Sequence, residues 1–516
     1  MATITLTTEE YQALVAERES LNHRLRIVTV ERDLLQEKLK AFLSKLFDAK
    51  SEVRGADQKD LFFNEAEILA PAGTPVAEEA TTEIEIPAHT RKKRGRKPLD
   101  PNLPREVVRH ELPESERVCA HDGSALVEIG VEISEQLDII PQQVRVIQHQ
   151  RVKYACPCCD ESIKVTPAPV RIIPKGLLTE AALAWVVTSK YMDALPLYRQ
   201  AALLGRFGGD LSRNTLAASI VRVGEAVQPI INLLRDHLLD ADLVHGDETT
   251  IQVLKEPGKK AQTKSYLWAQ ATGSGPPIRL FGYAPGRGGN HARDLYAGIK
   301  PGAVLITDGY EVYGGIAEAS GLTHLGCWAH CRRYFVEAEA VIPKTARSPG
   351  QLATQFIAII GELYAVESKA KDKTTAERLR LRDVQSRPVL QRIEAMLLKH
   401  LHAVVPGSLL GKALHYLSAQ WPKLVRYVEN GAWPIDNNLC ENAIRPFVIG
   451  RRNWLFADTV AGANASANLY SLIETCKANR IDPYAYLVSL FRKLPAAQSA
   501  DDFEAMLPWN LAANRR

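Results

Sequence analysis

The sequence predicts a multidomain protein with a central α/β domain and separate helical and β modules around it. Three observations support this prediction. The chain has 516 residues, which is enough for about three or four domains. Hydrophobic residues make up 46% of it and charged residues 24%, as in ordinary folded proteins and unlike disordered or fibrous ones. Residues 241–344 show strand-like and helix-like hydrophobic patterns in turn, whereas the segment before them is helical.

The overall charge and hydropathy say little about partners but argue against a membrane protein. The chain carries 64 Lys and Arg residues against 60 Asp and Glu residues, a net charge of +4, and charges in different segments can cancel. The sequence has no run of about 18 apolar residues, so we expect no membrane span. The N-terminus is polar and acidic, unlike a signal peptide. We therefore expect a cytoplasmic protein whose Cys residues are reduced thiols or metal ligands.

Residues 1–50 are predicted to form a coiled-coil helix. Apolar residues recur every seven positions, and a second row follows four positions after the first: Leu14, Leu21, Val28, Leu35 and Phe42, then Leu25, Leu39 and Leu46. Charged residues flank these rows. Sustained heptads favour a homodimer or higher oligomer. The alternative is a helix docked on its own chain, because Arg18 and Arg32 occupy second-row positions and weaken a long seam.

Residues 51–110 are predicted to be a linker with a DNA-contacting cluster. An acidic stretch without Lys or Arg precedes RKKRGRK, which has six basic residues in seven. This composition is typical of an unstructured tether. Arg94, Arg96 and Lys97 resemble an AT-hook core, whose extended Arg-Gly-Arg strand fits a narrow A·T minor groove. The alternative is a solvated basic run that contacts only phosphates.

Residues 111–170 are predicted to form a small β unit held by zinc. Apolar and polar residues alternate at 127–133, at Val144 and Val146, and at Val152 and Tyr154, as in half-buried strands. The sequences CAHDG and CPCCD bracket these strands, and CPCC contains the C-x-x-C spacing of a zinc knuckle. The predicted zinc ligands are Cys119, Asp122, Cys156 and Cys159. The fourth ligand could also come from His121 or Cys158, and a metal-free β unit with incidental thiols is the alternative.

Residues 171–240 are predicted to be a helical DNA-binding segment. Gly208 and Gly209 separate two short helical patterns, and Ser212 can cap the second helix. Two short helices joined by a Gly-containing turn are what a helix-turn-helix requires. Arg213 and Asn214 would then lie at the N-terminal end of the second helix, where such helices contact base edges. An ordinary helical bundle is the alternative.

Residues 241–344 are predicted to begin the α/β domain, in the order β-β-β-α-β-α-β-α. The strand-like runs are LVHGDETTIQVL, SYLWAQAT, IRLFGYA, AVLITDGY and HLGCWAH. Asp247 lies within the first run and Asp308 ends the fourth, whereas Glu248 should point to the opposite face of its strand. If these two strands are neighbours, the two aspartates converge and offer the oxygen ligands that Mg²⁺ or Mn²⁺ requires. Two such ions about 4 Å apart catalyse phosphoryl transfer. Taken singly, each carboxylate has a structural explanation.

A third carboxylate is needed to complete such a site, and Glu441 has the most suitable surroundings. Its neighbours Asn437, Asn438 and Arg445 are three or four residues away, so a helix would place amides and a cation on the same face. The other candidate carboxylates are Glu429, Asp436 and Glu474. The residues of this segment expected to contact DNA are Asn438, Arg445 and Arg451. Pro446 disfavours helix at the preceding residue, so we expect the helix to end or kink there.

His330 follows the fifth strand-like run, in CWAHCRR. We expect it to support the site by orienting a phosphate or a water molecule. The alternative is a hydrogen-bonded histidine of the core.

The run from Leu14 to Arg480 resembles the transposases of insertion-sequence family sixty-six, the TnpC type of DDE transposase. The matching stretches are KYMDALPLYRQ, LSRNTLA, HGDETTIQVL, ITDGY, GCWAHCRRYF and PIDNNLCENAIRPFVIGRRNWLFA, and GRKPL and EISEQLDIIPQQVRVIQHQRVKYACPCC also look like that family. These stretches are long and cover nearly the whole chain. Asp122 departs from the family, in which Cys is typical, and this puts the fourth zinc ligand in doubt.

The resemblance implies an RNase H-like catalytic core with a D-D-E triad. Matching motifs place the triad at Asp247 in HGDET, Asp308 in TDGY and Glu441 in NNLCE. The resemblance also implies the N-terminal coiled coil, the zinc-binding domain and the helical DNA-binding segment. Because a compact RNase H-like core needs a shorter interval before its third carboxylate, residues 345–430 are expected to be a helical insertion. Residues 431–516 then hold the Glu441 helix and a C-terminal segment.

We therefore expect a DNA transposase that binds the inverted-repeat ends of its element and catalyses metal-dependent strand cleavage and strand transfer. The expected cofactors are two Mg²⁺ or Mn²⁺ ions and a structural Zn²⁺ ion. The resemblance implies a bacterial protein that is nucleoid-associated when bound to DNA and that acts with two small accessory proteins of the same element. The alternatives are a metal-dependent nuclease without joining activity and a non-catalytic, dimeric DNA-binding regulator.

Overall fold

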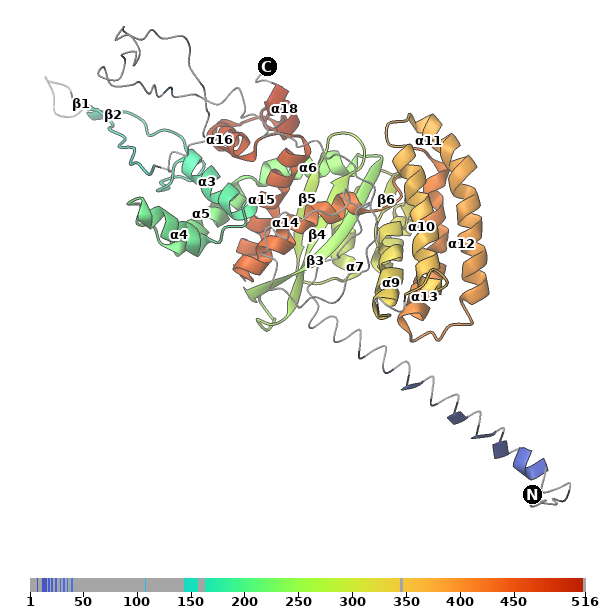
Figure 1. The fold of residues 1–516 in the computed structure, drawn as a ribbon. Helices are drawn as coiled ribbons and strands as arrows, with labels where there is room; N and C mark the ends of the chain where they lie inside the picture. The colour runs from blue at the N-terminus through green and yellow to red at the C-terminus, as the bar shows by residue number, and fades with distance from the viewer. Residues whose placement is uncertain are drawn as a thin grey trace, which may run out of the picture. The chain divides into compact units, whose positions relative to one another are not determined.

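The computed structural model describes residues 143–155, 163–343 and 347–513, together with Val107 and single positions between Thr7 and Leu39. The chain divides into two compact units, of which one comprises Met1–Lys50 and Val146–Arg516 and the other Ser51–Arg145. Every helix and strand named below belongs to the first unit (Figure 1). The predicted residues that lie outside the described ones are Arg94, Arg96 and Lys97 of the basic cluster and the zinc ligands Cys119, Asp122, Cys156 and Cys159. The helices that are described include none with the length and apolar character needed to cross a membrane.

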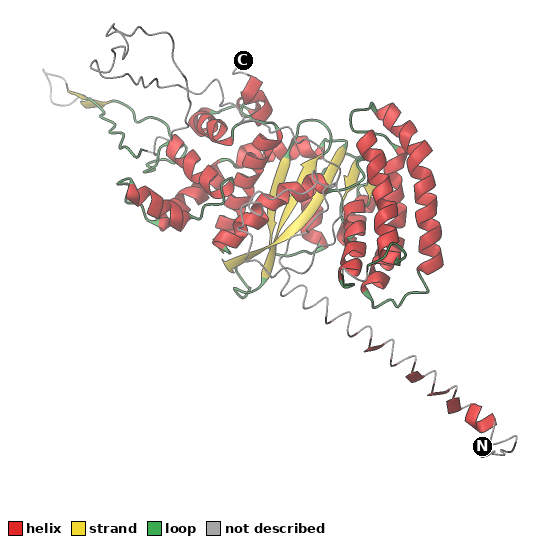
Figure 2. Cartoon of the chain, viewed as in Figure 1, coloured by secondary structure: helices red, strands yellow, loops and turns green. Residues whose placement is uncertain are grey.

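A mixed β-sheet forms the middle of the α/β domain (Figure 2). Its strands are β3 (Leu243–Lys255), β4 (Lys264–Thr272), β5 (Arg279–Ala284), β6 (Val304–Ile306), β7 (Thr323–Leu325) and β8 (Ala457–Thr459). The strand order is β5-β4-β3-β6-β7, and the short β8 pairs with the C-terminal end of β3. Strand β4 is antiparallel to both β3 and β5, whereas β6 and β7 continue the sheet parallel to β3. The two strands expected to carry the aspartates, β3 and β6, are therefore neighbours.

Three helices follow strands β5, β6 and β7, in the order that the sequence predicts. They are α7 (Gly289–Tyr296), α8 (Glu311–Ala319) and α9 (Trp328–Ala340). Strand β7 ends at Leu325 and α9 begins at Trp328, so the predicted fifth strand is shorter than expected. His330 consequently lies in the first turn of a helix.

The C-terminal part of the chain is helical and packs against the sheet. Its helices are α14 (Asn438–Trp454), α15 (Val460–Ala478), α16 (Pro483–Lys493), η5 (Leu494–Ala496), α17 (Ala500–Glu504) and α18 (Pro508–Ala513). Helix α14 contacts β3 and β4, and α15 lies along β5. The hydroxyls of Ser471 and Thr475 in α15 accept hydrogen bonds from the backbone N–H groups of Phe281 (2.8 Å) and Arg279 (3.0 Å) in β5. These bonds satisfy an edge strand that would otherwise be open to another chain.

The expectation was that helix α14 ends or kinks at Arg445; it does not end there, because α14 continues through Pro446 to Trp454. Proline removes one hydrogen bond from the helix ladder, to the carbonyl four residues earlier. The buried side chains of Ile444 and Phe447 lie on either side of the proline and hold both halves of the helix in the core.

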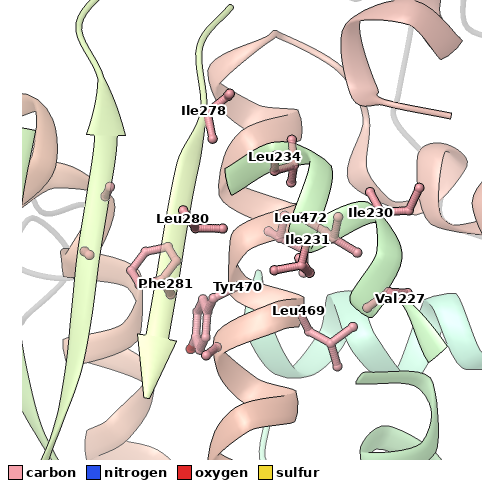
Figure 3. Close-up of a cluster of buried hydrophobic side chains, with 14 of the residues drawn as sticks. Val227, Ile230, Ile231, Leu234, Ile278, Leu280, Phe281, Leu469, Tyr470 and Leu472 are labelled. Carbon is pink, nitrogen blue, oxygen red and sulfur yellow. The ribbon is translucent and has the colours of Figure 1, made fainter. Parts of the chain in front are cut away.

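The main hydrophobic core includes the side chains between β5 and the helices α6 and α15. Figure 3 shows apolar side chains of α6 (Gln228–Leu239), β5 and α15 that meet there. Ile230 and Leu234 of α6 are fully buried, as are Leu469 and Leu472 of α15. Burial of each such side chain contributes about 1.5–3 kcal/mol, so this core fixes the C-terminal helices on the sheet.

A helical segment separates α9 from α14 in the sequence. It comprises α10 (Leu352–Lys369), α11 (Thr375–Leu381), η3 (Arg382–Ser386), α12 (Arg387–His400), α13 (Leu409–Leu424) and η4 (Val425–Glu429). Its apolar side chains form a second core cluster, which includes Phe335 of α9 stacked on Phe356 of α10 at 4.6 Å between ring centroids. The guanidinium of Arg382 is buried and pairs with Glu367 at 2.6 Å. The segment thus has a core of its own and is anchored to the α/β domain through α9.

Helices α3 (Glu180–Tyr191), α4 (Leu197–Arg206) and α5 (Arg213–Ala226) precede α6 and pack on one another. The Thr179 hydroxyl caps α3 by accepting from the N–H of Ala182, and the Ser212 hydroxyl caps α5 by accepting from the N–H of Thr215. Gly208 lies in the connection between α4 and α5 with φ +82°, a conformation that glycine adopts without strain. The short helices and glycine turn predicted for this segment are present.

Part of the predicted zinc-binding β unit is described. Strands β1 (Lys153–Ala155) and β2 (Ile163–Val165) form an antiparallel pair. Residues 143–152 form no strand, and the side chains of Val144 and Val146 are exposed, which corrects the expectation of a half-buried strand there.

The positions described between Gln12 and Leu39 are helical, as the heptad pattern predicts. Their large apolar side chains are exposed in the single chain: Leu14, Leu21, Leu25, Val28, Leu35 and Leu39. Residues with 51–65% of their surface exposed are not docked on the described part of their own chain. An apolar row left open in this way is what a coiled coil buries when it associates.

Candidate active site

Parallel pairing of β3 with β6 brings two aspartates to the same end of the sheet. The register pairs His245 with Ile306, so Asp247 and Asp308 each follow two residues after the paired positions. The carboxylate of Asp308 is held by its own loop, where its Oδ1 accepts from the N–H of Tyr310 at 2.9 Å. Both side chains line a pocket of about 400 Å³.

Glu441 reaches the same pocket from the first turn of α14. The helix is anchored on β4 one residue earlier, where the Cys440 Sγ donates to the carbonyl of Ala269 at 3.5 Å. Only 13% of the Glu441 side chain is exposed. Three carboxylates from β3, the loop after β6 and α14 therefore meet in one pocket, as the sequence predicts.

The electrostatics of the pocket show that these carboxylates are close together. Desolvation raises the pKa of Asp247 well above its usual range, and the charges of Glu248, Asp308 and Glu441 raise it further. Like charges in a partly desolvated site repel one another unless a cation or a proton neutralises them. The arrangement therefore favours binding of a multivalent cation by oxygen ligands.

Glu441 has two basic neighbours from α9. Its carboxylate lies 3.0 Å from Arg333 Nη2 and 3.2 Å from His330 Nδ1. Desolvation lowers the pKa of His330 even though Glu441 raises it. Burial also lowers the pKa of Arg333, but the negative charge of Glu441 more than offsets this effect and raises it overall. His330 therefore lies where the sequence places a supporting residue, in contact with the third carboxylate.

A buried asparagine joins the elements that carry the three carboxylates. The side chain of Asn437 donates to the carbonyl of Gly246 at 2.9 Å, and its Oδ1 lies 2.9 Å from His245 Nδ1. Its backbone N–H donates to the Sγ of Cys327, just before α9, at 3.2 Å. Asn437 thus ties β3, α9 and the start of α14 together. From the sequence, Asn437 was expected only to share a helix face with Glu441.

A second ion pair, between Glu248 and Arg287, lines the pocket and was not predicted from the sequence. Glu248 lines the same pocket as Asp247, which corrects the expectation that it faces away. Three consecutive residues of β3, from Asp247 to Thr249, line the pocket. Arg287 Nη2 lies 2.5 Å from Glu248 Oε1, and the Tyr313 hydroxyl donates to Glu248 Oε2 at 2.6 Å. The basic residue in the Gly-rich run APGRGGN was the available signal for this pair.

The other predicted residues of the α14 segment lie in different surroundings. Arg445 lines the pocket. Arg451 instead packs on β3, where its Nη1 donates to the hydroxyl of Thr250 at 2.9 Å. The amide of Asn438 donates to Asp436 Oδ2 at 2.8 Å. The rival carboxylates Glu429, Asp436 and Glu474 do not line the pocket.

Arg213 and Asn214 are exposed at the N-terminal end of α5. This is the position expected for the recognition helix of a helix-turn-helix. Their contact with DNA stays a prediction.

Cys327, His330 and Glu441 place possible ligand atoms within 4.8 Å of one another. Burial raises the pKa of the Cys327 thiol well above its usual range, as do nearby carboxylates. A protonated thiol is a poor ligand for a hard cation, whereas the three carboxylates supply the oxygen atoms that Mg²⁺ and Mn²⁺ prefer. The carboxylates Asp247, Asp308 and Glu441 are therefore the better candidates for holding a catalytic metal.

Protein-family models match most of the chain. The model described as transposase IS66 family matches residues 175–465, and the zinc-finger binding domain of transposase IS66 matches residues 116–160. The IS66 C-terminal element matches residues 471–509. A model described as transposase C of IS166 homeodomain matches residues 34–108.

Individual proteins are also similar to this chain. The uncharacterized proteins y4qI and y4jD of Sinorhizobium fredii strain NGR234 are 34% and 32% identical to it, over 78% and 80% of this chain and 75% and 82% of their own lengths. Protein y4hP of the same strain is 30% identical over 92% of this chain and 88% of its own length. A crystal structure of a pre-cleavage Mos1 transpososome matches 50% of this chain and 81% of its own at 13% identity. Its TM-score of 0.13 is too low to support an inference about the fold.

Proposed function

The chain belongs to the IS66 family of transposases, and on that premise we propose that it cleaves and joins DNA through the triad Asp247, Asp308 and Glu441. Transposases act on DNA, so DNA is its partner, and the family match includes a zinc-finger domain. The observation that carries the proposal is the convergence of three carboxylates from separate elements on one pocket. We propose the inverted-repeat ends of an insertion sequence, and then target DNA, as its substrates.

The sheet supports an RNase H-like assignment for the α/β domain. Three antiparallel strands are followed by two parallel ones, with β3 in the middle of the order β5-β4-β3-β6-β7. The first aspartate lies on the central strand and the second just after its parallel neighbour. The helix that carries the third carboxylate packs on β3 and β4. In this proposal residues 241–344 and 431–516 form the catalytic core, and residues 345–430 are an insertion into it.

The donor set fits two Mg²⁺ or Mn²⁺ ions. All three side chains offer oxygen atoms, and mutual repulsion contributes to the raised pKa of Asp247, so a divalent cation relieves a conflict that the fold itself creates. Bound ions would activate the attacking oxygen and stabilise the leaving oxygen of a phosphodiester. Water and then the freed 3′-hydroxyl would be the nucleophiles, so we expect no covalent protein–DNA intermediate.

The surrounding residues prepare the carboxylates for this chemistry. Arg333 and His330 contact Glu441 and hold it in place while the site contains no cation. Asn437 fixes α14 against β3, which sets the position of Glu441 relative to Asp247. These contacts position the ligands before DNA arrives, and positioning of this kind lowers the barrier to reaction.

The remaining modules are assigned to DNA binding and assembly. We propose that residues 1–50 form the coiled coil of a dimer or larger assembly and that residues 111–170 bind structural zinc through Cys119, Asp122, Cys156 and Cys159. In this proposal residues 171–240 place Arg213 and Asn214 against DNA, and the linker 51–110 contributes its basic cluster. Asn438, Arg445 and Arg451 are proposed DNA contacts of the core. Participation of small accessory proteins from the same element is part of the same proposal.

An assay with DNA that carries the inverted repeats flanking the coding sequence tests this function. The wild-type protein is expected to nick that DNA in Mg²⁺ or Mn²⁺ and to join the freed 3′ end to a second duplex. Asp247→Asn and Glu441→Gln are expected to lose both reactions by at least about a hundredfold while they keep DNA binding. Glu429→Gln, at an exposed rival carboxylate outside the pocket, is the matched control and should cleave normally.

The outcomes separate the proposal from its alternatives. Cleavage without joining indicates a nuclease, and binding without cleavage indicates a regulator. Undiminished cleavage by either triad variant contradicts the assignment of the triad.

A further inference from the structure

Arg287 and Arg333 both line the pocket, and among the described residues Arg287 forms no hydrogen bond or ion pair with a member of the triad. Building on the proposed function, we propose that Arg287 is a binding residue for a DNA phosphate and that Glu248, Tyr310 and Tyr313 are positioning residues that hold it for this purpose. The ligand class is a phosphodiester group of the strand that enters the pocket.

The guanidinium of Arg287 is fixed from several directions. Its Nε donates to Glu248 Oε1 at 2.7 Å, and its Nη2 lies 2.5 Å from the same oxygen. The ring of Tyr310 stacks on it at 3.8 Å from the ring centroid. The hydroxyl of Tyr310 in turn donates to the backbone carbonyl of Arg287 at 2.7 Å. The side chain has therefore lost most of its rotational freedom before any ligand binds, which reduces the entropic cost of binding.

Glu248 is committed to this arginine and is not free to serve as a fourth metal ligand. Only 3% of its side chain is exposed. One carboxylate oxygen is used by Arg287 and the other by the buried hydroxyl of Tyr313 at 2.6 Å. Its negative charge also raises the pKa of the neighbouring Asp247. A buried carboxylate that repels the proposed metal ligand Asp247 is costly. We propose that Glu248 is present because it orients Arg287.

The exposed part of Arg287 faces the pocket. The side chain is 41% exposed and lines the pocket with Asp247, Asp308 and Glu441. Within the described residues, Nη1 has no hydrogen-bond partner, so its donors are available to a ligand. A planar guanidinium with free donors matches phosphate oxygens better than any neutral group does.

Arg287 differs from Arg333 in its ion-pair partner. Arg333 pairs with Glu441, which is itself a proposed metal ligand, so that contact has to change when a cation binds. The pair of Arg287 and Glu248 involves no triad member. Arg287 can consequently hold a phosphate through the whole reaction without disturbing the metal ligands.

Salt-dependent binding to the inverted-repeat duplex tests this proposal, with Ca²⁺ in place of Mg²⁺ so that the DNA stays intact. The double variant Arg287→Met/Glu248→Gln removes the cation without leaving a buried carboxylate unpaired, and Tyr313 can still donate to the glutamine. We expect about tenfold weaker binding and a log–log salt slope that is shallower by about 0.9. Mn²⁺ binding to the DNA-free variant should match the wild type. Arg293→Met, an exposed arginine of α7 outside the pocket, is the matched control and should keep the wild-type slope.

A single neutral methylphosphonate, placed in turn at each phosphate near the cleavage point, identifies the contact. At one position it should weaken binding of the wild type but not of the double variant. If the double variant fails to fold, Arg287→Lys carries the test, because it keeps the ion pair with Glu248. The same methylphosphonate should weaken its binding less than that of the wild type.

The outcomes distinguish this inference from the function on which it rests. Wild-type affinity and salt slope in the double variant, or equal methylphosphonate effects in Arg287→Lys, overturn the role of Arg287 while the triad stands. A wild-type protein that does not bind the inverted-repeat duplex at all overturns both proposals.

Discussion

At the scale of single residues, two features define the site. One is a set of charged side chains that the fold brings close together, and the other is a neutral side chain whose hydrogen bonds join the elements that carry them. Desolvation raises the pKa of Asp247 well above its usual range, and the charges of Glu248, Asp308 and Glu441 raise it further. Asn437 bears no charge, yet it contacts β3, the start of α14 and the residue before α9. The carboxylates could be predicted from the sequence because acidic residues on apolar strands are unusual. Asn437 could not, because nothing in the chain order shows which backbone groups its amide will meet, and the Gly-rich run around Arg287 does not show that this residue pairs with Glu248.

Removal of the Asn437 amide should loosen the site. Asn437→Ala leaves the buried His245 ring and the Gly246 carbonyl without partners, so the free energy of unfolding should fall by about 3 kcal/mol. Asn438→Ala is the matched control, because its half-buried amide contacts only Asp436, and it should lose less than about 1 kcal/mol. Urea unfolding curves of both variants give the comparison. Equal decreases in the free energy of unfolding would show that the hydrogen bonds of Asn437 do not stabilise the site more than those of Asn438.

The raised pKa of Asp247 predicts how stability depends on pH in metal-free protein. The folded protein holds the Asp247 proton more tightly than the unfolded chain does, so stability falls as pH rises from the unfolded pKa through the raised folded one. Asp247→Asn removes this penalty. In a chelator, its melting temperature should exceed that of the wild type at neutral pH, and the difference should shrink toward pH 4, near the usual pKa of aspartate. A variant that is less stable than the wild type at neutral pH contradicts the electrostatic account.

At the scale of elements, the hydrophobic pattern predicted some helices and strands and failed to predict others. The strands β3 to β7 and the helices between them follow the predicted order because each has an apolar run bounded by turn residues. Helix α15 was not predicted as the cover of β5. It is buried on nearly all sides between α5 and the sheet, so it lacks the one-sided apolar stripe by which surface helices are recognised. The alternation at Val144 and Val146 shows the reverse case, because it lies in residues that form no strand.

The helical segment between α9 and α14 should depend on its buried ion pair. Arg382 is 1% exposed, pairs with Glu367 and donates to the carbonyls of Tyr427 and Asn430 at 2.7 Å. Arg382→Ala leaves the carboxylate and both carbonyls unpaired and should cost about 3–5 kcal/mol. Arg387→Ala breaks an exposed pair with Asp383 and should cost less than about 1 kcal/mol. Hydrogen exchange of α10 to α13 measures both, and similar exchange in the two variants would contradict this ranking.

At the scale of the whole molecule, the site is assembled from parts that the sequence keeps far apart. In the sequence, the third carboxylate is separated from the first two by a helical segment that has its own hydrophobic core. The near-balance of charge conceals this arrangement, because the acidic residues of the pocket are matched by Arg287, Arg333 and Arg445 around it. The order of elements could therefore be predicted from the sequence, and the choice of Glu441 rested on helix spacing and family resemblance. The formation of the pocket depends on contacts between distant segments, and no local sequence pattern shows these contacts.

The central claim is that the three carboxylates hold the catalytic cations, and a change of metal preference in Asp308→Cys tests it most directly. Asp308 is half-buried and contacts its own loop, so the smaller side chain should fold. A thiolate is a soft ligand that the hard Mg²⁺ ion binds poorly and that the softer Mn²⁺ ion tolerates. We predict that Asp308→Cys cleaves inverted-repeat DNA in Mn²⁺ but not in Mg²⁺, whereas the wild type cleaves in both. Cleavage by the variant in Mg²⁺ at the wild-type rate, or failure in both ions by a variant that folds and binds DNA, would contradict the claim.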